Sequence, residues 1–231
     1  MAITQIIHFD AGRFLDTHAS GTTVDDAIQK AVTALKGVKT PPQHFVIGTQ
    51  VQDKGVVQIT AEWDAVVPPD SATFETTPEF TSFISTVGNF FGEPQSISHV
   101  ILNRSAFGKD APVTTSAVEF VEIYFPTSRV TPEFQKQIDE DFLRFDEILD
   151  AKGSVSWGTG WVLEEQDYED IKGEKAKLFL VARGWESLDN FEQVIKSDGY
   201  KEAIPVLLAW NVTWKIWHVE RKFLSGFEVV A

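Results

Sequence analysis

The stretch LFLVARGWES at residues 178–187 decides the fold of this chain. Leu178 to Val181 are apolar at consecutive positions, which is typical of a strand buried on both faces of its sheet. The segment from Ile3 to Phe9, near the start of the chain, has the same character and predicts a second such strand. Each of these strands needs a cover on both sides.

The elements around these two strands follow the same order in each half of the chain: strand, helix, strand, strand, helix, strand. In the second half, a helix that begins at Thr131-Pro132 is predicted by apolar residues at helical spacing, namely Phe134, Ile138, Phe142, Phe145 and Leu149. The later helical stretch, 188–208, is expected to break near residues 197–199. In the first half, Thr23 and Asp26 predict the start of a helix, whereas His18 is placed in a polar loop.

Two residue pairs support the correspondence between the halves. Trp63 and Trp185 end equivalent strands, and each is followed at a similar distance by a histidine in the last strand of its half, His99 and His218. We therefore expect a duplication, with a first ferredoxin-like unit at 1–107, a linker at 108–116 and a second unit at 117–231.

A single βαββαβ unit covers one face of its sheet with helices and leaves the other face bare. Two units on one chain can cover each other's bare faces. The sequence therefore predicts an α+β fold in which two tandem ferredoxin-like (βαββαβ) units form an intramolecular two-sheet α/β barrel. Such a barrel would be complete in a monomer.

Composition narrows the classes of function. The chain of 231 residues has no cysteine, which excludes disulfides, thiolate metal sites and cysteine nucleophiles. Its net charge of −14 disfavours nucleic acid and anionic membranes as partners. It contains no apolar run of transmembrane length and no recognisable secretion signal, so we expect a cytoplasmic protein.

Residues 179–187, together with Phe191 and KSDGYK at 196–201, resemble the antibiotic-biosynthesis-monooxygenase (ABM) branch of the dimeric α/β-barrel superfamily. The acidic stretch LEEQDY at 163–168 is also similar to that family. The resemblance covers the second half well, and the first half keeps a degenerate form. It implies the barrel fold with a pocket between the helices and the sheet of each unit. Family members include cofactor-free monooxygenases, haem-degrading enzymes, polyketide cyclases and proteins without a known reaction.

Haem-degrading members of the family carry a tryptophan just before the Lys196-Ser197-Asp198 tripeptide and an iron-binding histidine on the next helix. In this sequence the corresponding positions are Val194 and Ile204 or Pro205. No histidine pair has metal-ligand spacing. We therefore expect neither a metal nor a bound cofactor.

The candidate catalytic residues are His8, Tyr124, Arg183 and His218. His8 and Tyr124 lie late in the first strand of their unit and could face a pocket. His218 could act as a general acid or base, although a structural role shared with His99 is the simpler interpretation. Arg183 interrupts an apolar strand, so it either forms an ion pair with Glu122 or stabilises an anionic ligand.

Four tryptophans are candidates for a binding wall that would hold a hydrophobic or aromatic small molecule: Trp157, Trp185, Trp210 and Trp214. Core filling is the alternative for most of them. The leading hypothesis is a small-molecule enzyme of secondary or aromatic metabolism, either a cofactor-independent monooxygenase or a polyketide-type cyclase that uses acid/base chemistry. The alternative is a non-catalytic small-ligand-binding or stress-related protein of the same fold.

Overall fold

The structure is a computed structural model that describes residues 2–63 and 74–225. Its first half forms one antiparallel sheet with the strand order β4-β1-β3-β2. The strands are β1 (Ile3–Asp10), β2 (His44–Gln50), β3 (Val56–Trp63) and β4 (Pro94–Val100). Both faces of β1 are covered, as the sequence predicts: Ile7 packs with the helices and Ile6 with the core inside the barrel.

The second half repeats this strand order as β8-β5-β7-β6. Its strands are β5 (Ala117–Pro126), β6 (Ser154–Gln166), β7 (Ala176–Trp185) and β8 (Trp214–Leu224). The LFLVARGW stretch lies in β7, with every residue from Leu178 to Trp185 buried.

The two sheets join at both of their edges into one closed barrel of eight strands. Strand β2 pairs with β8, and β4 pairs with β6. The predicted fold class is confirmed: each sheet supplies the cover that the other lacks, within one chain. The boundaries 1–107, 108–116 and 117–231 and the origin by duplication stay predictions, and residues 64–73 and 226–231 of these units lie outside the described residues.

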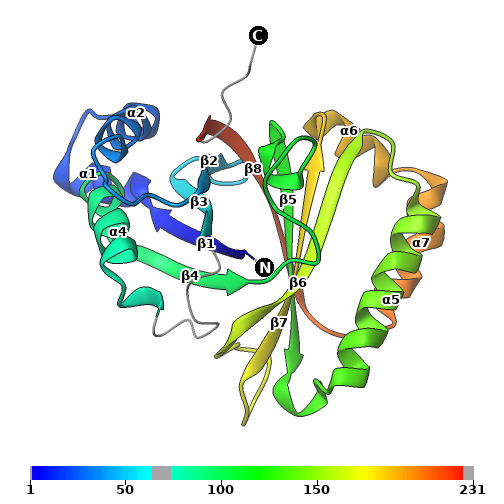
Figure 1. Cartoon of the computed structure of the whole chain (residues 1–231). Helices are drawn as coiled ribbons and strands as arrows, with labels where there is room; N and C mark the ends of the chain where they lie inside the picture. The colour runs from blue at the N-terminus through cyan, green and yellow to red at the C-terminus, as the bar shows by residue number, and fades with distance from the viewer. Residues whose placement is uncertain (1, 64–73, 226–231) are drawn as a thin grey trace.

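Helices cover the outside of the barrel in two groups on opposite sides (Figure 1). The first group is α1 (Ala11–His18), α2 (Val24–Leu35) and α4 (Pro78–Phe91), and the second is α5 (Pro132–Leu149), α6 (Leu188–Val194) and α7 (Asp198–Leu208). Each group shares an apolar core with its own sheet, and a third core fills the barrel itself. Among the described helices, none is long and apolar enough to cross a membrane.

Local sequence signals fix most helix starts. Thr23 and Asp26 form the expected capping box at the start of α2, with hydrogen bonds of 3.1 and 3.2 Å between each side chain and the other residue's backbone N–H. The expected break in 188–208 is confirmed, because Ser197 caps a new helix by accepting the N–H of Tyr200. The loop assignment of His18 is wrong: His18 lies in the last turn of α1, which begins where Asp10 caps the N–H of Arg13.

A glycine in each unit allows the two seams between the sheets to close. Gly48 on β2 faces β8, where an added Cβ would lie 2.5 Å from Val219 Cγ1 and 2.6 Å from the Glu220 carbonyl oxygen. Gly160 on β6 faces the end of β4, where a Cβ would overlap the carbonyl oxygen of Ile101. A side chain at either position would therefore push the strands of its seam apart.

Candidate active site

A cavity of about 360 Å³ lies between the sheet of the second unit and helices α5, α6 and α7. Its walls are mostly apolar, and the polar groups on it are Glu119, Arg183, Tyr200 and the indole of Trp214. The remaining lining residues are Val121, Ile123, Phe142, Phe145, Val181, Phe191, Ile195, Ile204, Leu207 and Ile216. Such a lining suits a hydrophobic or aromatic ligand that carries one or two polar groups.

Glu119 is the central polar group of this cavity. It lies on β5 between two cross-strand neighbours, His218 on β8 and Arg183 on β7. The indole Nε1–H of Trp185 donates to Glu119 Oε2 at 2.9 Å. Burial raises the pKa of Glu119, while Arg183 and the Trp185 hydrogen bond oppose that rise. A carboxyl group with a raised pKa on an apolar wall is suited to accept and return a proton.

Arg183 lies on the same cavity wall, and it forms an ion pair with Asp146 of α5. Its Nη2 donates to Asp146 Oδ1 at 2.6 Å, and its Nη1 donates to Ser154 Oγ at 3.1 Å. The expected ion pair between Arg183 and Glu122 is wrong. Glu122 lies opposite Leu180 in the register of β5 and β7, and its side chain faces the inside of the barrel. The ion pair holds the guanidinium in place without removing its charge from the neighbourhood of Glu119.

Tyr200 and Trp214 lie on the same cavity as Glu119. Burial and the negative charge of Glu119 raise the pKa of the Tyr200 phenol. The phenol is therefore a hydrogen-bond donor at neutral pH and not a phenolate base.

The candidate His218 lies close to this cavity but is not on its wall. Its ring is 4.2 Å from the ring of Phe191, a wall residue, and burial lowers the pKa of its imidazole. Gln52 accepts the backbone N–H of His218 with Oε1 and reaches ring atom Nδ1 with Nε2, at 3.1 Å each. These two contacts place the ring proton of His218 on Nε2, which has no hydrogen-bond partner within the described part of the chain.

The other two catalytic candidates, His8 and Tyr124, lie together in a different cavity at the mouth of the barrel. Both ring nitrogens of His8 are occupied, by Ser96 Oγ and Gln58 Oε1 at 2.9 Å each. Tyr124 donates its hydroxyl to Glu122 at 2.5 Å, and burial raises its pKa far above the usual phenol value. Because His8 and Tyr124 lie at the barrel mouth and Arg183 lines the helix–sheet cavity, the structure does not bring the four candidates to one centre.

The four candidate tryptophans also divide between different places. Trp214 alone lines the helix–sheet cavity. The indole N–H groups of Trp157 and Trp210 donate to Asp146 and Asp141 of α5, at 2.6 and 3.0 Å. Trp185 is fully buried beneath the cavity and holds Glu119. Trp157 lines another, more polar cavity beside Arg104 and Asp146, so the four tryptophans do not share one wall.

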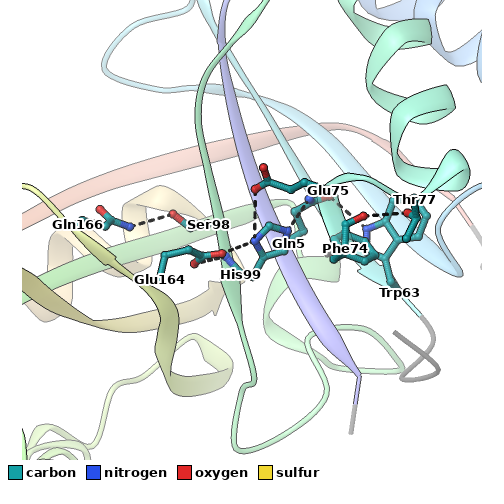
Figure 2. A network of polar contacts seen from close by, with 9 residues as sticks. All are labelled: Gln5, Trp63, Phe74, Glu75, Thr77, Ser98, His99, Glu164 and Gln166. Atoms are coloured by element: carbon teal, nitrogen blue, oxygen red, sulfur yellow. Dashed lines mark hydrogen bonds and ion pairs between the residues drawn. The ribbon is translucent and has the colours of Figure 1, made fainter. Parts of the chain in front are cut away.

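One cluster has the composition of a metal site: Glu75, His99 and Glu164 offer ligand atoms within 4.8 Å of one another (Figure 2). The hydrogen bonds around His99 argue against that use. Trp63 donates its indole N–H to Gln5 Oε1 at 3.1 Å, so Gln5 Nε2 is left to donate to His99 Nε2 at 2.9 Å. His99 therefore carries its ring proton on Nδ1 and donates it to Glu164. A metal ion would need the lone pair of that same nitrogen.

Among the residues that line the helix–sheet cavity, no histidine is available to bind haem iron. Ile204, at one of the two positions that correspond to the iron ligand of haem-degrading relatives, lies on the cavity wall. The residues present do not fit a haem of that type.

Sequence reasoning missed Glu119 and Tyr200. The available signal for Glu119 was its position in β5. Glu119 lies on the same strand face as Val121 and Ile123, which pack with the helices. Glu122 lies on the opposite face, with Phe120 and Tyr124, inside the barrel. The cross-strand register that places Glu119 beside Arg183 depends on the pairing of β5 with β7, which no local pattern encodes.

Comparison with known proteins gives similarity in structure only. No family model and no curated protein matches the sequence. An anthrone oxidase-like protein is similar over 100% of this chain and 95% of its own, with 13% identity and a TM-score of 0.59. A monooxygenase candidate from Lactobacillus acidophilus NCFM is similar over 96% of this chain and 95% of its own, with 10% identity and a TM-score of 0.53.

A chlorite dismutase candidate has the same fold, with 11% identity, a TM-score of 0.54 and coverage of 96% of this chain and 95% of its own. These proteins are named for different reactions, so the similarity establishes the fold and not the chemistry. The comparisons confirm the fold that the resemblance implies.

Proposed function

We propose that this chain, which has the fold of ABM-like α/β-barrel proteins, is a small-molecule enzyme of secondary or aromatic metabolism. Its active site would be the cavity between the helices and the sheet of the second unit. The observation that carries this proposal is Glu119, a carboxyl group with a raised pKa on an apolar cavity wall beside Arg183.

The cavity favours a planar aromatic substrate with few polar groups, because Phe142, Phe145 and Trp214 supply flat apolar contacts. A similar structure is named anthrone oxidase-like. An anthrone is a planar aromatic ketone whose C–H bonds are acidified by its carbonyl group. A substrate of this class needs a base and a group that stabilises negative charge on the carbonyl oxygen.

In the proposed reaction, the Glu119 carboxylate removes a proton from the activated C–H or phenol. A raised pKa makes this carboxylate a stronger base than an exposed glutamate. The negative charge spreads onto the substrate oxygen, where the nearby Arg183 guanidinium stabilises it.

Two outcomes follow from the same carbanion. In a monooxygenation, it adds O2 to give a peroxide, which takes a proton back from Glu119. The peroxide then loses water, so that a CH2 group and O2 become a C=O group and H2O. In a cyclisation, the carbanion attacks a carbonyl carbon of the same substrate, and the resulting alkoxide takes the proton from Glu119.

Anthrone in aerated buffer provides a direct test. We expect the protein to accelerate oxygen uptake and anthraquinone formation, and Glu119→Gln to lower the rate constant by about 10²- to 10⁴-fold. Glu202→Gln, an exposed acid on α7, is the matched control and should leave the rate unchanged. Equal rates for Glu119→Gln and the unchanged protein would refute the role of Glu119.

The alternative function is a non-catalytic binder of small aromatic ligands. One observation favours it: the charge of Arg183 is already matched by Asp146. In that case an aromatic ligand such as anthraquinone should bind in the cavity, and Glu119→Gln should keep its affinity while no turnover occurs in either protein.

We also propose that the protein works as a monomer in the cytoplasm. Closure of both sheet edges within one chain supports the monomer. The absence of cysteine fits a compartment in which disulfides are not used.

A further inference from the structure

A second cavity, at the mouth of the barrel, is distinct from the proposed active site. It has a volume of about 650 Å³ and lies at the mouth of the barrel, where every strand except β7 contributes a residue. Ile216 alone borders both cavities. Below the mouth, the barrel is filled by apolar side chains such as Ile6, Phe120 and Leu180.

The floor of the mouth is held rigidly by hydrogen bonds. Gln58 Oε1 accepts from Trp217 Nε1 at 2.7 Å and from His8 Nε2 at 2.9 Å. The Gln58 amide donates to Thr60 at 3.1 Å, and His8 Nδ1 is paired with Ser96. The shape of the floor is therefore set before any ligand enters.

The wall above this floor is rich in uncharged hydrogen-bonding groups: Gln50, Gln52, Gln95, Ser96, Ser98 and Gln166. The side chains of Gln50 and Gln95 have no hydrogen-bond partner within the described ranges, and Gln166 has only a long contact of 3.5 Å to Ser98. Carboxamides both donate and accept, so they can pair with hydroxyl groups in either sense.

The titratable groups at the mouth also favour their uncharged forms. Burial lowers the pKa of His8 and raises the pKa of Glu122. Burial likewise raises the pKa of Tyr124 and Tyr168, whose rings stack at 3.8 Å. Two cations lie on or near the rim: Lys175 pairs with Asp167 at 2.7 Å, and Lys215 lies over the rings of Tyr124 and Tyr168.

We propose that the barrel mouth binds a neutral polyhydroxylated small molecule, namely a monosaccharide or a cyclic polyol. The hydroxyl groups of such a ligand would pair with the carboxamides of Gln50, Gln95 and Gln166. Its C–H face would pack on the aromatic side chains Tyr168 and Trp217, which line the same cavity. An anionic ligand is disfavoured by the acidic protein, and a cationic ligand by Lys215.

This site can be tested with glucose, myo-inositol and glucose 6-phosphate as probes, in titration calorimetry and saturation-transfer NMR of the whole chain. We expect saturable binding of at least one neutral probe, with glucose 6-phosphate weaker. Gln166→Leu and Tyr168→Ala should each weaken that binding at least tenfold.

Two controls keep the result specific. Gln29→Leu replaces an exposed glutamine on α2, and Glu119→Gln alters the other cavity, so both should bind the neutral probe with unchanged affinity. Circular dichroism and thermal unfolding establish that the variants are folded. If the Glu119→Gln variant still binds the neutral probe, the barrel-mouth site is independent of the proposed enzymatic function.

Three results would overturn the proposal. The first is no saturable binding of either neutral probe up to about 100 mM, which corresponds to a binding free energy weaker than about 1.4 kcal/mol. The second is tighter binding of glucose 6-phosphate than of glucose. The third is a neutral-probe affinity that Gln166→Leu and Tyr168→Ala leave unchanged in folded protein.

Discussion

Glu164 holds His99 across the seam between β4 and β6 by two hydrogen bonds, one from the ring Nδ1–H and one from the backbone N–H at 3.1 Å. The other seam repeats this arrangement: Gln52, from the first half, contacts the ring Nδ1 and the backbone N–H of His218. Gly48 precedes Gln52 by four residues, and Gly160 precedes Glu164 by four. Each seam is thus built from one glycine, one side chain of the opposite unit and one histidine.

The His99–Glu164 contact should make stability depend on pH. Burial raises the pKa of Glu164, but the hydrogen bonds from His99 outweigh it, so the net pKa is lowered. A lowered folded pKa stabilises the protein above the ordinary carboxyl range, and this contribution is lost as pH falls through the folded pKa. We expect Glu164→Ala to cost about 2 kcal/mol in urea unfolding at pH 7 and less at pH 3. Glu165→Ala, at the exposed neighbour, is the control, and an equal loss in both variants would contradict the assignment.

Substitution of the seam glycines should open the barrel. Gly160→Ala would place a Cβ against the Ile101 carbonyl, and Gly48→Ala would place one against Val219 and Glu220. We expect each to destabilise the fold by about 1–3 kcal/mol in urea unfolding. Gly88→Ala, where an added Cβ meets nothing within 4 Å, should instead be neutral or stabilising because it lies inside α4. Seam variants as stable as Gly88→Ala would refute the close approach.

Glu119 and Gln5 occupy equivalent positions in the two units. We therefore expect Glu119→Gln and Gln5→Glu to have opposite effects on stability near neutral pH. Each accepts the indole N–H of its unit's tryptophan, Trp185 or Trp63, and each pairs in register with the last-strand histidine. Because the pKa of Glu119 is raised, its contribution to stability is lost as pH rises through the folded pKa. We expect Glu119→Gln to become more stable than the unchanged protein as pH is raised from 4 to 8.

The reciprocal substitution Gln5→Glu should destabilise the fold by about 1–3 kcal/mol at pH 7, since it removes the donor to His99 Nε2 and buries a carboxyl group. Urea unfolding across this pH range measures both variants. A stability difference for Glu119→Gln that does not change with pH would contradict the raised pKa.

Removing only one partner of the ion pair between Arg183 and Asp146 should strongly lower the free energy of unfolding. The Arg183 side chain is 4% exposed, and Asp146 also accepts the indole N–H of Trp157 at 2.6 Å. We expect Asp146→Ala to destabilise the protein by about 3 kcal/mol in thermal or urea unfolding, because it leaves a buried guanidinium without its charged partner. Asp139→Ala, at an exposed position of the same helix that has no ion pair or hydrogen bond to β7 among the described residues, should cost much less. Equal losses would contradict a specific role for Asp146.

Closure of the barrel within one chain predicts a monomer. Light scattering coupled to size-exclusion chromatography should give a mass near 25.8 kDa that does not change with concentration. A stable dimer would show that a further surface, outside the two seams, is used for assembly.

The sequence by itself determined the fold because its decisive features are local or repeated. Adjacent apolar residues, Ile6 and Ile7 in the first half and Leu178 to Val181 in the second, required strands covered on both faces, and the repeated element order supplied the second sheet. The break at 197–199 and the cap at Thr23 were also readable, because capping and turn chemistry act over a few residues. The helix that contains His18 was missed because it has only eight residues, a stretch too short for helical spacing to be told from a loop.

The tertiary structure alone decided which polar residues meet. Arg183 was visible as a charge in an apolar strand, but its partner Asp146 is 37 residues away and on another element. His8 and Tyr124 line the cavity at the barrel mouth, where they have Gln58, Ser96 and Glu122 as partners and are separated from Arg183. Glu119 became prominent only through its register with Arg183 and His218. Cross-strand register and side-chain pairing arise from contacts distant in sequence, so they are fixed when the barrel closes and not before.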